Sequence, residues 1–291
     1  SHDTIRNLGS KIGAKIILAQ NAPHVPLIPG FFQDAKAKQP LTTDEWKAKA
    51  AAIGFPLLIK AAAGGGGKGM RVVRKIEDFE GALESVRTEA RGAFGDETFL
   101  LERYFEDVRH IEVQVFGDKY GNVTHLFERE CSVQRRHQKL VEECPSPALS
   151  IDMRAKICNA AVAVAKSVNY CNAGTVEFIY ENGKAPGEDG RFYFLEVNTR
   201  LQVEHGVTEL CTNVDIVKTQ VFVASGLKIQ DALEAARTNP SLPPIPQQPN
   251  GHSIEVRVYA EDDNFAPCVG TVSGFELYPH AKYHCSTVVG S

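Results

Sequence analysis

The sequence predicts an α/β (α+β) fold in which a small, mobile lid lies over a larger mixed or antiparallel sheet with helices. Residues 25–104 carry a β-α-β-β-α-β succession of patterns, compact enough to move as one lid. Beyond them, residues 111–127 and 175–197 each contain two strand patterns around a turn, which is typical of antiparallel hairpins. The length of 291 residues leaves room for two domains or one large domain.

Each predicted element follows from a local pattern. Residues 4–20 place apolar side chains at helical spacing, and Thr42 or Thr43 caps a second helix that runs to Gly54. The other lid elements are strands at 55–60, 70–74 and 99–104 and a helix at 77–90. The larger part carries hairpin strands at 111–116, 123–127, 175–180 and 192–197, helices at 151–168 and 209–224, a proline-rich connector at 240–249 and a strand at 252–260.

A glycine-rich loop, residues 64–69, joins two strands of the predicted lid. It fits the pattern Gly-x-Gly-x-x-Gly, but a dinucleotide-binding loop opens a helix, whereas Val72 and Val73 favour a strand here. A Walker A loop is excluded because Lys68 is followed by Gly69 and not by Ser or Thr. A hairpin tip with bare backbone N–H groups remains, and such a tip can fold over phosphates. The alternative is a flexible, solvated loop; the flanking strands and lysines favour phosphate binding.

Composition indicates an ordinary soluble globular protein without a nucleic-acid or membrane partner. Hydrophobic residues make up 43% and charged residues 23%, and the net charge of −4 offers no basic surface for nucleic acid. No apolar run is long enough to span a bilayer. The seven cysteines form no C-x-x-C pair and are predicted to be reduced thiols in an intracellular protein. The chain starts at Ser1 without a Met, as a fragment would.

Three oxygen-bearing side chains of the second hairpin predict a metal site. Glu196 and Asn198 are two positions apart on a strand and therefore point to one face. If Glu181 opposes Phe192, then Glu177 opposes Glu196 and the three donors converge. Carboxylate and amide oxygens suit Mg²⁺ or Mn²⁺, with phosphate oxygens and water completing the octahedron. The alternative is a solvated strand face with scattered acids.

Two polar clusters accompany this predicted metal site. Arg200 and Glu204 follow it, and such a pair can clamp an anion and act as a general base, although an ordinary polar loop would look similar. Residues 128–130, Glu-Arg-Glu, and residues 134–139, Gln-Arg-Arg-His-Gln-Lys, form a cluster that is either a solvated face or a means of neutralising phosphate charge. His110 could reach a ribose or phosphate, but a lone histidine is more often structural.

With these residues in place, the chain resembles the biotin carboxylase component of biotin-dependent carboxylases, members of the ATP-grasp superfamily. The matching stretches are residues 60–70, 109–112, 128–139 and 194–205. The likeness covers nearly the whole chain, and it implies an ATP-grasp fold. It also implies three parts, namely a helical lead-in from a preceding lobe (1–24), the lid (25–104) and an incomplete catalytic and C-terminal subdomain (105–291).

The resemblance implies a reaction and a set of site residues. ATP phosphorylates bicarbonate to carboxyphosphate, and the CO₂ it yields carboxylates N1 of biotin with Mg²⁺ or Mn²⁺ present. The implied ATP ligands are Lys11, Lys60, Gly64, Gly65, Gly66, Gly67, Met70, His110, Gln134 and His137, with the backbone near Glu102 and Phe105 meeting adenine. The implied metal ligands are Glu177, Glu196 and Asn198. The implied bicarbonate-binding residues are Lys139, Arg200, Gln202 and Val203. Glu204 resembles the base that deprotonates bicarbonate, and Arg257 resembles the arginine that steadies the biotin enolate.

The sequence departs from the family pattern in three places. A Rossmann-like segment of roughly a hundred residues precedes the position of Ser1 in family members, and the chain stops before the end of the C-terminal lobe. Gly206 follows His205 where many relatives have proline, which frees the loop behind Glu204.

The resemblance also implies partners and a location. The partners would be biotin carboxyl carrier and carboxyltransferase domains of the same polypeptide, and the full-length protein would be a homo-oligomer. The location would be the cytoplasm, or the mitochondrial matrix if the parent carries a transit peptide. Another domain would select the final acceptor, which is an acyl-CoA, pyruvate or urea. The alternatives are another ATP-grasp ligase, such as a carbamoyl-phosphate synthetase half, and a non-catalytic nucleotide-binding fragment. The Arg-Arg-His-Gln-Lys run at 135–139 favours biotin carboxylase over the carbamoyl-phosphate synthetase half.

Overall fold

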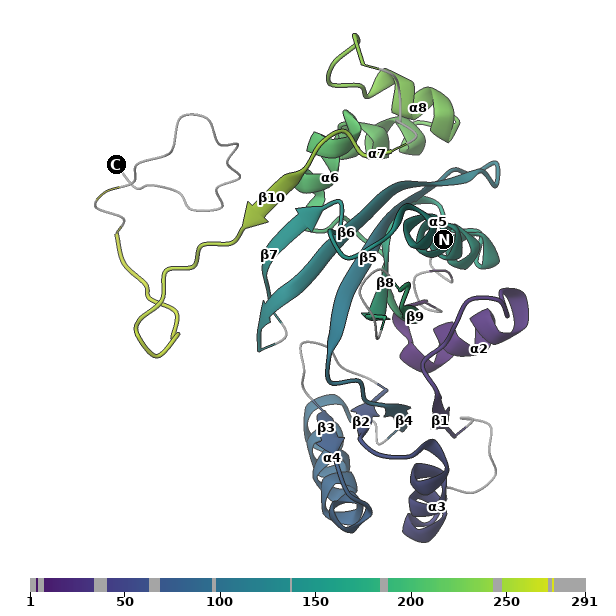
Figure 1. Cartoon of the computed structure of the whole chain (residues 1–291), viewed down its shortest axis with the longest axis vertical. Coiled ribbons are helices and arrows are strands. Elements are labelled where there is room, and N and C mark those ends of the chain that lie inside the picture. The colour runs from purple at the N-terminus through teal and green to yellow at the C-terminus, as the bar shows by residue number, and fades with distance from the viewer. Residues whose placement is uncertain are drawn as a thin grey trace. The chain divides into compact units, whose positions relative to one another are not determined.

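The structure, a computed structural model, describes residues 4, 8–33, 41–62, 69–95, 98–136, 138–183, 188–242, 248–271 and 274. The chain divides into two compact units, Ser1–Val256 and Arg257–Ser291. Every described helix and named strand lies in the first unit (Figure 1). Within the described residues, no helix is both long and apolar enough to cross a membrane.

A four-stranded antiparallel sheet, the lid sheet, is formed by residues from the predicted lid in the order β1-β4-β2-β3. Its elements are β1 (Gly30–Phe32), α3 (Thr43–Ile53), β2 (Leu57–Ala61), β3 (Met70–Val73), the 3-10 turn η1 (Ile76–Asp78), α4 (Phe79–Phe94) and β4 (Phe99–Arg103). The predicted β-α-β-β-α-β order is confirmed. Helix α3 begins at a capping box between Thr42 and Glu45 and ends at Gly54, whose φ of 87° suits glycine.

The glycine loop joins two strands, as predicted. Strands β2 and β3 are antiparallel neighbours, and Lys60 pairs with Met70 at the base of the loop. The Gly69 carbonyl accepts from Ala61 N at 2.8 Å, and Gly69 N donates to Glu89 Oε1 at 3.0 Å. Because β3 begins at Met70, no helix opens after the loop and the dinucleotide-binding alternative is wrong.

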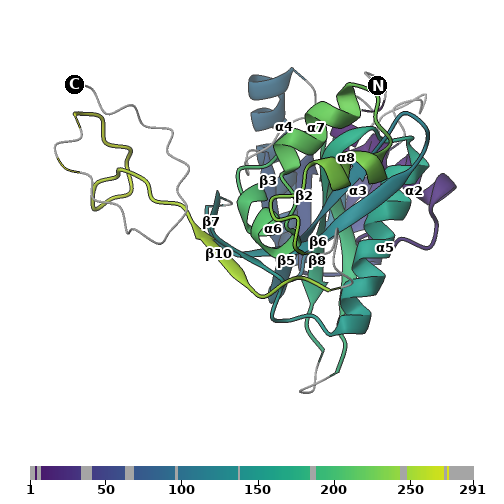
Figure 2. The ribbon, with the colours of Figure 1, turned by 90° about the horizontal axis from the view of Figure 1, so that it is seen from above.

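The second sheet, the central sheet, has six antiparallel strands in the order β10-β7-β6-β5-β8-β9. The strands are β5 (Val108–Gly117), β6 (Val123–Arg135), β7 (Gln138–Cys144), β8 (Asn172–Glu181), β9 (Arg191–Asn198) and β10 (Ser253–Val256). The helices around it are α2 (Lys11–Asn21), α5 (Ile151–Ser167), α6 (His205–Thr212), α7 (Ile216–Ala224) and α8 (Ile229–Ala235). Helices α2 and α5 cover one face, and α6, α7 and α8 lie on the other (Figure 2).

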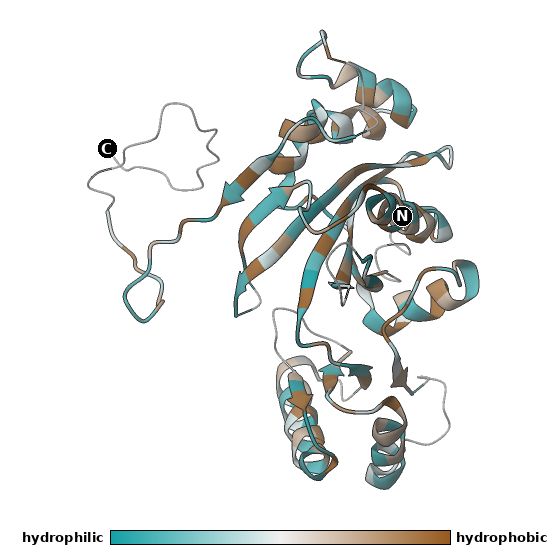
Figure 3. Cartoon of the chain, in the orientation of Figure 1, coloured by the Kyte–Doolittle hydropathy of each residue, from teal (hydrophilic) through white to brown (hydrophobic). Residues whose placement is uncertain are grey.

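The two faces of the central sheet differ in chemistry. Along β5, Ile111, Val113 and Val115 join the apolar core under α5, whereas Glu112 and Gln114 point to the opposite face and are equally buried. Figure 3 shows apolar and polar segments along the same central strands. The predicted hairpin alternation is confirmed, and the polar face is therefore part of the interior.

Two elements differ from the sequence predictions, one helix that is divided and one strand that was missed. The helix expected at 209–224 is two helices, because Asn213 adopts a left-handed conformation (φ 59°) that ends α6. Asp215 then caps α7 by accepting from Lys218 N at 2.8 Å. Strand β7 was not predicted; Gln134 near the end of β6 pairs with Lys139 near the start of β7, so both residues belong to the β6–β7 hairpin.

Candidate functional site

The β8–β9 hairpin brings the predicted metal ligands together. Glu177 pairs with Glu196 across the two strands, as predicted. The premise for that register is wrong, because Glu181 pairs with Arg191 and not with Phe192. A one-residue bulge in β9 just before Glu196 makes up the difference. Directly opposed residues have Cβ atoms about 5 Å apart, so the two carboxylates lie together on the polar face.

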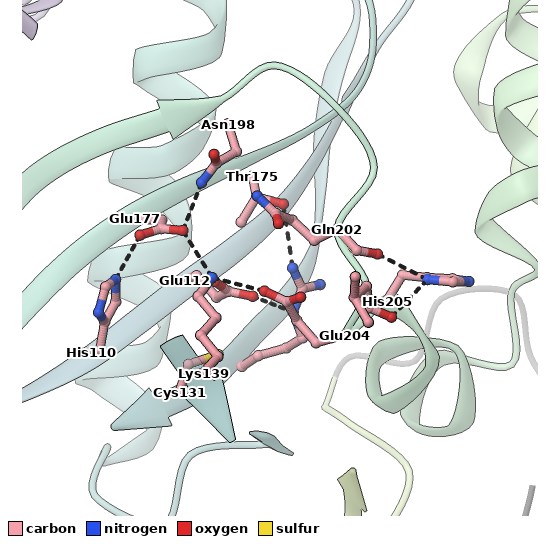
Figure 4. Close-up of polar contacts among 12 residues, drawn as sticks. His110, Glu112, Cys131, Lys139, Thr175, Glu177, Asn198, Gln202, Glu204 and His205 are labelled. Atoms are coloured by element: carbon pink, nitrogen blue, oxygen red, sulfur yellow. Dashed lines mark hydrogen bonds and ion pairs between the residues drawn. The ribbon is translucent and has the colours of Figure 1, made fainter. Parts of the chain in front are cut away.

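Lys139 in β7 lies at the centre of the site and contacts three carboxylates (Figure 4). Its Nζ is 2.9 Å from Glu177 Oε1 and 2.7 Å from Glu204 Oε1, and it also donates to Glu112. An ammonium group has three N–H donors, so each carboxylate takes one. Burial lowers the pKa of Lys139, but the three negative charges outweigh burial and the net shift is upward. Lys139 therefore stays charged and holds Glu177 and Glu204 side by side.

His110 in β5 holds the other side of Glu177. Its Nε2 is 2.6 Å from Glu177 Oε2, and its Nδ1 is 2.8 Å from the amide nitrogen of Gln134. Because that amide donates, Nδ1 accepts and Nε2 carries the proton toward the carboxylate. Asn198 Nδ2 donates to Glu177 Oε1 at 2.6 Å. Burial raises the pKa of Glu177, but His110 and Lys139 prevail and lower it to about 2, so the group is ionised.

Glu196 faces lysines from the first part of the chain. Burial and the charge of its cross-strand neighbour raise the pKa of Glu196, while Lys11 and Lys60 act in the opposite direction. Burial lowers the pKa of Lys11. Lys60 Nζ is also 2.6 Å from Glu102 Oε2, and Glu102 contacts Lys15 as well. The predicted nucleotide lysines Lys11 and Lys60 thus influence the charge of the predicted metal ligand Glu196.

The donor set fits a hard divalent cation. Glu177, which is buried, and Glu196, which is half-buried, are carboxylates in direct opposition, and their mutual repulsion contributes to the raised pKa of Glu196. The Asn198 amide nitrogen is engaged with Glu177, which leaves the amide oxygen as a third donor. A cation between these oxygens would remove the repulsion, and Mg²⁺ and Mn²⁺ accept such ligands.

Among the described residues, one other group has metal-ligating atoms close together, namely Glu112, Cys131 and Glu204. Glu112 is ion-paired with both Arg129 and Lys139, and Glu204 is ion-paired with Lys139. Burial raises the pKa of the Cys131 thiol well above its usual value, so it is protonated. This group is therefore already neutralised by cationic side chains.

The segment after β9 divides the predicted bicarbonate residues between the interior and the surface. Glu204 and Gln202 are buried with Lys139. Val203 is 58% exposed. Arg200 is exposed and donates to the carbonyl of Leu201 at 3.1 Å. The buried residues of this set lie at the site, and the contacts of Arg200 and Val203 lie outside it.

Other predicted site residues lie at the edge of this region or elsewhere. Phe105 stacks on Tyr193 with ring centroids 5.0 Å apart. Arg257 is the first residue of the second compact unit, and its predicted place within a strand is wrong because β10 ends at Val256. The predicted residues Gly64, Gly65, Gly66, Gly67 and His137 lie outside the described residues.

Sequence reasoning gave no role to Glu112 or Thr208 and treated Arg129 only as part of a polar cluster, whereas the structure buries all three completely beside Lys139 and Glu204. Arg129 Nε is 2.6 Å from Glu112 Oε1. One signal was available for Glu112 and Gln114, because two polar residues alternate with three aliphatic ones on a strand covered on both faces. No comparable local signal marks Thr208, which is a helix residue brought close by the fold.

Comparison with known proteins places the chain in a family. Residues 19–232 match the family described as the carbamoyl-phosphate synthase L chain, ATP binding domain. The mitochondrial methylcrotonoyl-CoA carboxylase subunit alpha of Dictyostelium discoideum is 45% identical over 273 residues, which cover 93% of this chain and 36% of that protein. Pyruvate carboxylase of Bacillus subtilis is 46% identical over 86% of this chain and 21% of that protein. The chain thus spans about a third or less of the length of these relatives.

Solved structures agree with the sequence relatives. A biotin carboxylase from Campylobacter jejuni, in a β-γ-ATP complex, has a TM-score of 0.78 and 41% identity over 92% of this chain and 55% of that chain. The biotin carboxylase domain of 2-oxoglutarate carboxylase from Hydrogenobacter thermophilus, with MgADP, ADP and bicarbonate, has a TM-score of 0.75 and 40% identity over 96% of this chain and 61% of that chain. The fold is therefore that of ATP-grasp proteins, as predicted. The relatives named above are carboxylases, and the solved structures named above are biotin carboxylases. The chain belongs to the family of the carbamoyl-phosphate synthase L chain ATP-binding domain.

Proposed function

We propose that the chain is the biotin carboxylase part of a biotin-dependent carboxylase. The substrates would be ATP, bicarbonate and biotin, with Mg²⁺ or Mn²⁺ at Glu177, Glu196 and Asn198. The observation that carries the proposal is the position of Lys139, whose ammonium contacts both Glu177 and Glu204 within 2.9 Å. A base for bicarbonate thereby lies one side chain away from the ligands of the metal that would hold the phosphates of ATP.

The residues of the site support a division of labour. Lys11 and Lys60 surround Glu196 with positive charge and would receive phosphate oxygens, while the cation would neutralise charge that develops on the transferred phosphoryl group. Once Lys139 releases one of its three carboxylates, Lys139 and Gln202 would hold bicarbonate beside Glu204. Glu204 would then take the proton of bicarbonate, since it is buried and ion-paired only 2.7 Å from Lys139.

Arg200 would complete the anion site after a change of side-chain conformation. Its guanidinium is exposed and can leave the Leu201 carbonyl at little cost. A guanidinium binds an oxyanion through two parallel N–H groups, which a lysine cannot do. Arg257 would act in the later step, in which CO₂ meets the biotin enolate.

The proposal extends to partners and location. Carrier and carboxyltransferase domains of a longer polypeptide would receive the carboxyl group, and the full-length protein would be an oligomer. The final acceptor would be set by those domains. Since relatives include mitochondrial and bacterial carboxylases, we propose an intracellular protein of the cytoplasm or the mitochondrial matrix. We also propose that residues 25–104 move as a lid over the central sheet.

The first test is ATP cleavage by the full-length gene product with bicarbonate and free biotin. We expect phosphate release to require both substrates. Nucleotide binding without turnover would support a non-catalytic domain, and turnover that ignores biotin would support another ATP-grasp ligase, so either result would contradict the proposal.

The second test separates the base from the anion clamp. Glu204→Gln keeps the shape of the side chain but removes the base, so we expect the maximal rate to fall by about two to four orders of magnitude with little change in bicarbonate affinity. Arg200→Ala should weaken bicarbonate use without changing ATP affinity. If Glu204→Gln carboxylated biotin at the wild-type rate, the base would lie elsewhere.

A further inference from the structure

Arg129 in β6 is completely buried and connects three elements around the site. Its Nε donates to Glu112 Oε1 at 2.6 Å, and its other nitrogens donate to Gln114 Oε1 and Thr208 Oγ1 at 3.0 Å and to Thr175 Oγ1 at 3.3 Å. Burial lowers the pKa of this guanidinium, but the charges of Glu112 and Glu204 outweigh burial and raise it. Arg129 is therefore a fixed cation.

Glu204 depends on helix α6 for its position. It occupies the N-cap of α6, yet its side chain makes no capping hydrogen bond and turns to Lys139 instead. An N-cap side chain usually accepts a hydrogen bond from a backbone N–H of the first turn, and the start of α6 lacks this stabilising contact. Thr208 lies one turn further on the same side of α6. Its hydroxyl, which accepts from Arg129, therefore fixes the face of α6 from which Glu204 projects.

These contacts form a closed ring. Arg129 donates to Glu112, Glu112 accepts from Lys139, and Lys139 donates to Glu204. One turn of α6 connects Glu204 to Thr208, and Thr208 accepts from Arg129. Each side chain of the ring is buried or nearly buried, so water cannot easily replace a missing member.

We propose that Arg129 and Thr208 are positioning residues that set the distance between Glu204 and Lys139. Arg129 fixes Lys139 through Glu112 from one side, and it fixes the first turn of α6 through Thr208 from the other side. Neither residue belongs to the set proposed to hold bicarbonate. The inference rests on the proposed function, since the ring matters for catalysis only if Glu204 is the base for bicarbonate.

The test changes Thr208 and leaves Arg129 in place, because removal of a buried arginine would strand Glu112 and unfold the site. Thr208→Val keeps the shape and removes the acceptor. Thr212→Val is the matched control, since Thr212 is a fully buried threonine of the same helix whose hydroxyl donates to the Thr208 carbonyl at 2.7 Å and does not contact Arg129. Thr208→Ser restores the hydroxyl.

In the full-length gene product we expect Thr208→Val to lower kcat for bicarbonate-dependent, biotin-dependent ATP cleavage by about 10- to 100-fold. Its affinity for MgATP by calorimetry should stay within about two-fold, because the ring does not include the predicted nucleotide residues. Thr208→Ser should recover most of kcat, and Thr212→Val should stay within about two-fold of wild type. Equal kcat values for Thr208→Val and Thr212→Val would overturn the proposal.

A second measurement separates this inference from the proposed function. Hydrogen exchange of the α6 amides does not depend on activity, and Thr208→Val should speed exchange in the first turn by about three- to ten-fold relative to Thr212→Val. A wild-type protein without bicarbonate-dependent turnover would refute the proposed function alone. Unchanged exchange in Thr208→Val would refute the proposal that Thr208 fixes the first turn of α6, whatever the activity.

Discussion

The apolar core of the lid and the polar face of the central sheet bury different kinds of side chain. The lid core is built from apolar residues such as Trp46, Phe79 and Leu83. The central sheet has an equally apolar face under α5, but its other face buries the ions of Glu112 and Arg129 with no exposure. Burying an ion costs several kcal/mol unless it is well paired. The central sheet therefore buries charged groups that selection for stability alone would not favour. The lid core buries apolar groups that selection for stability does favour.

The largest expected effect comes from removing a charge on the polar face of the central sheet. Glu196→Gln should lower ATP turnover by about 100- to 1000-fold, since a cation ligand is lost. Nucleotide binding should weaken less, because Lys11 and Lys60 remain. The variant should be as stable as wild type or more stable, since burial and the charge of Glu177 already disfavour an ionised Glu196. Phosphate release, MgATP calorimetry and urea unfolding would measure the three properties.

A matched control lies in the same hairpin. Glu181→Gln removes an exposed ion pair with Arg191, and it should change turnover by less than about two-fold. If Glu196→Gln turned over ATP at the wild-type rate, the metal assignment would be refuted. If it lost turnover and stability together, the contrast between the two faces of the sheet would fail.

The second prediction concerns the lid core, and it uses the single tryptophan of the chain, Trp46. Leu83→Ala removes a fully buried side chain from α4 and should cost about 2–5 kcal/mol of lid stability. Trp46 fluorescence reports this part of the chain, and far-UV circular dichroism reports the whole. If residues 25–104 are a separate lid, the midpoint of the fluorescence transition of Leu83→Ala should shift to a lower urea concentration. The midpoint of most of the dichroism transition should not change.

Ile157→Ala is the counterpart in α5, with an equally buried side chain in the apolar core of the central sheet. It should shift the dichroism transition and leave the Trp46 transition nearly unchanged. Coincident shifts of both signals in both variants would mean that the two sheets unfold as one unit, and the proposed lid boundary would then be wrong.

The same contrast explains how much could be predicted from the sequence. The spacing of apolar residues and the cap and turn residues were sufficient to predict the lid elements, where Thr42 caps α3 and β3 follows the glycine loop. They failed where a backbone detail decides the outcome. Asn213 ends α6 through a left-handed residue, and a bulge before Glu196 shifts the register by one. Neither feature leaves a periodic trace in the sequence.

The candidate site was predictable only in part, for a related reason. Glu177, Glu196 and Asn198 belong to one hairpin, so the alternation of side chains along its strands predicts that they share a face. The ring through Glu112 and Arg129 joins β5, β6, β7 and α6, and its members are distant along the chain. Charge pairing inside a fold is set by tertiary packing, which no local pattern encodes.

The smallest expected effect concerns the one buried acid of the lid sheet that faces lysines, Glu102, in contact with Lys15 and Lys60. Burial raises the pKa of Glu102, but the two lysines outweigh burial and lower it below its usual 4.5. A carboxylate with a lowered pKa contributes stability above its unfolded-state pKa, and that contribution is lost as the pH falls through the folded-state pKa. Wild-type lid stability should therefore decline between about pH 5 and pH 3.

Glu102→Gln should be less stable at neutral pH because it leaves two lysines without their carboxylate. It should then lose less further stability on acidification than wild type does. Urea unfolding followed by Trp46 fluorescence at pH 7 and at pH 3.5 would measure this difference. Glu80→Gln, in the exposed first turn of α4, should follow the wild-type acid profile. An acid profile of Glu102→Gln parallel to wild type would show that this ion cluster does not stabilise the lid, and the lid would then owe its stability to apolar packing alone.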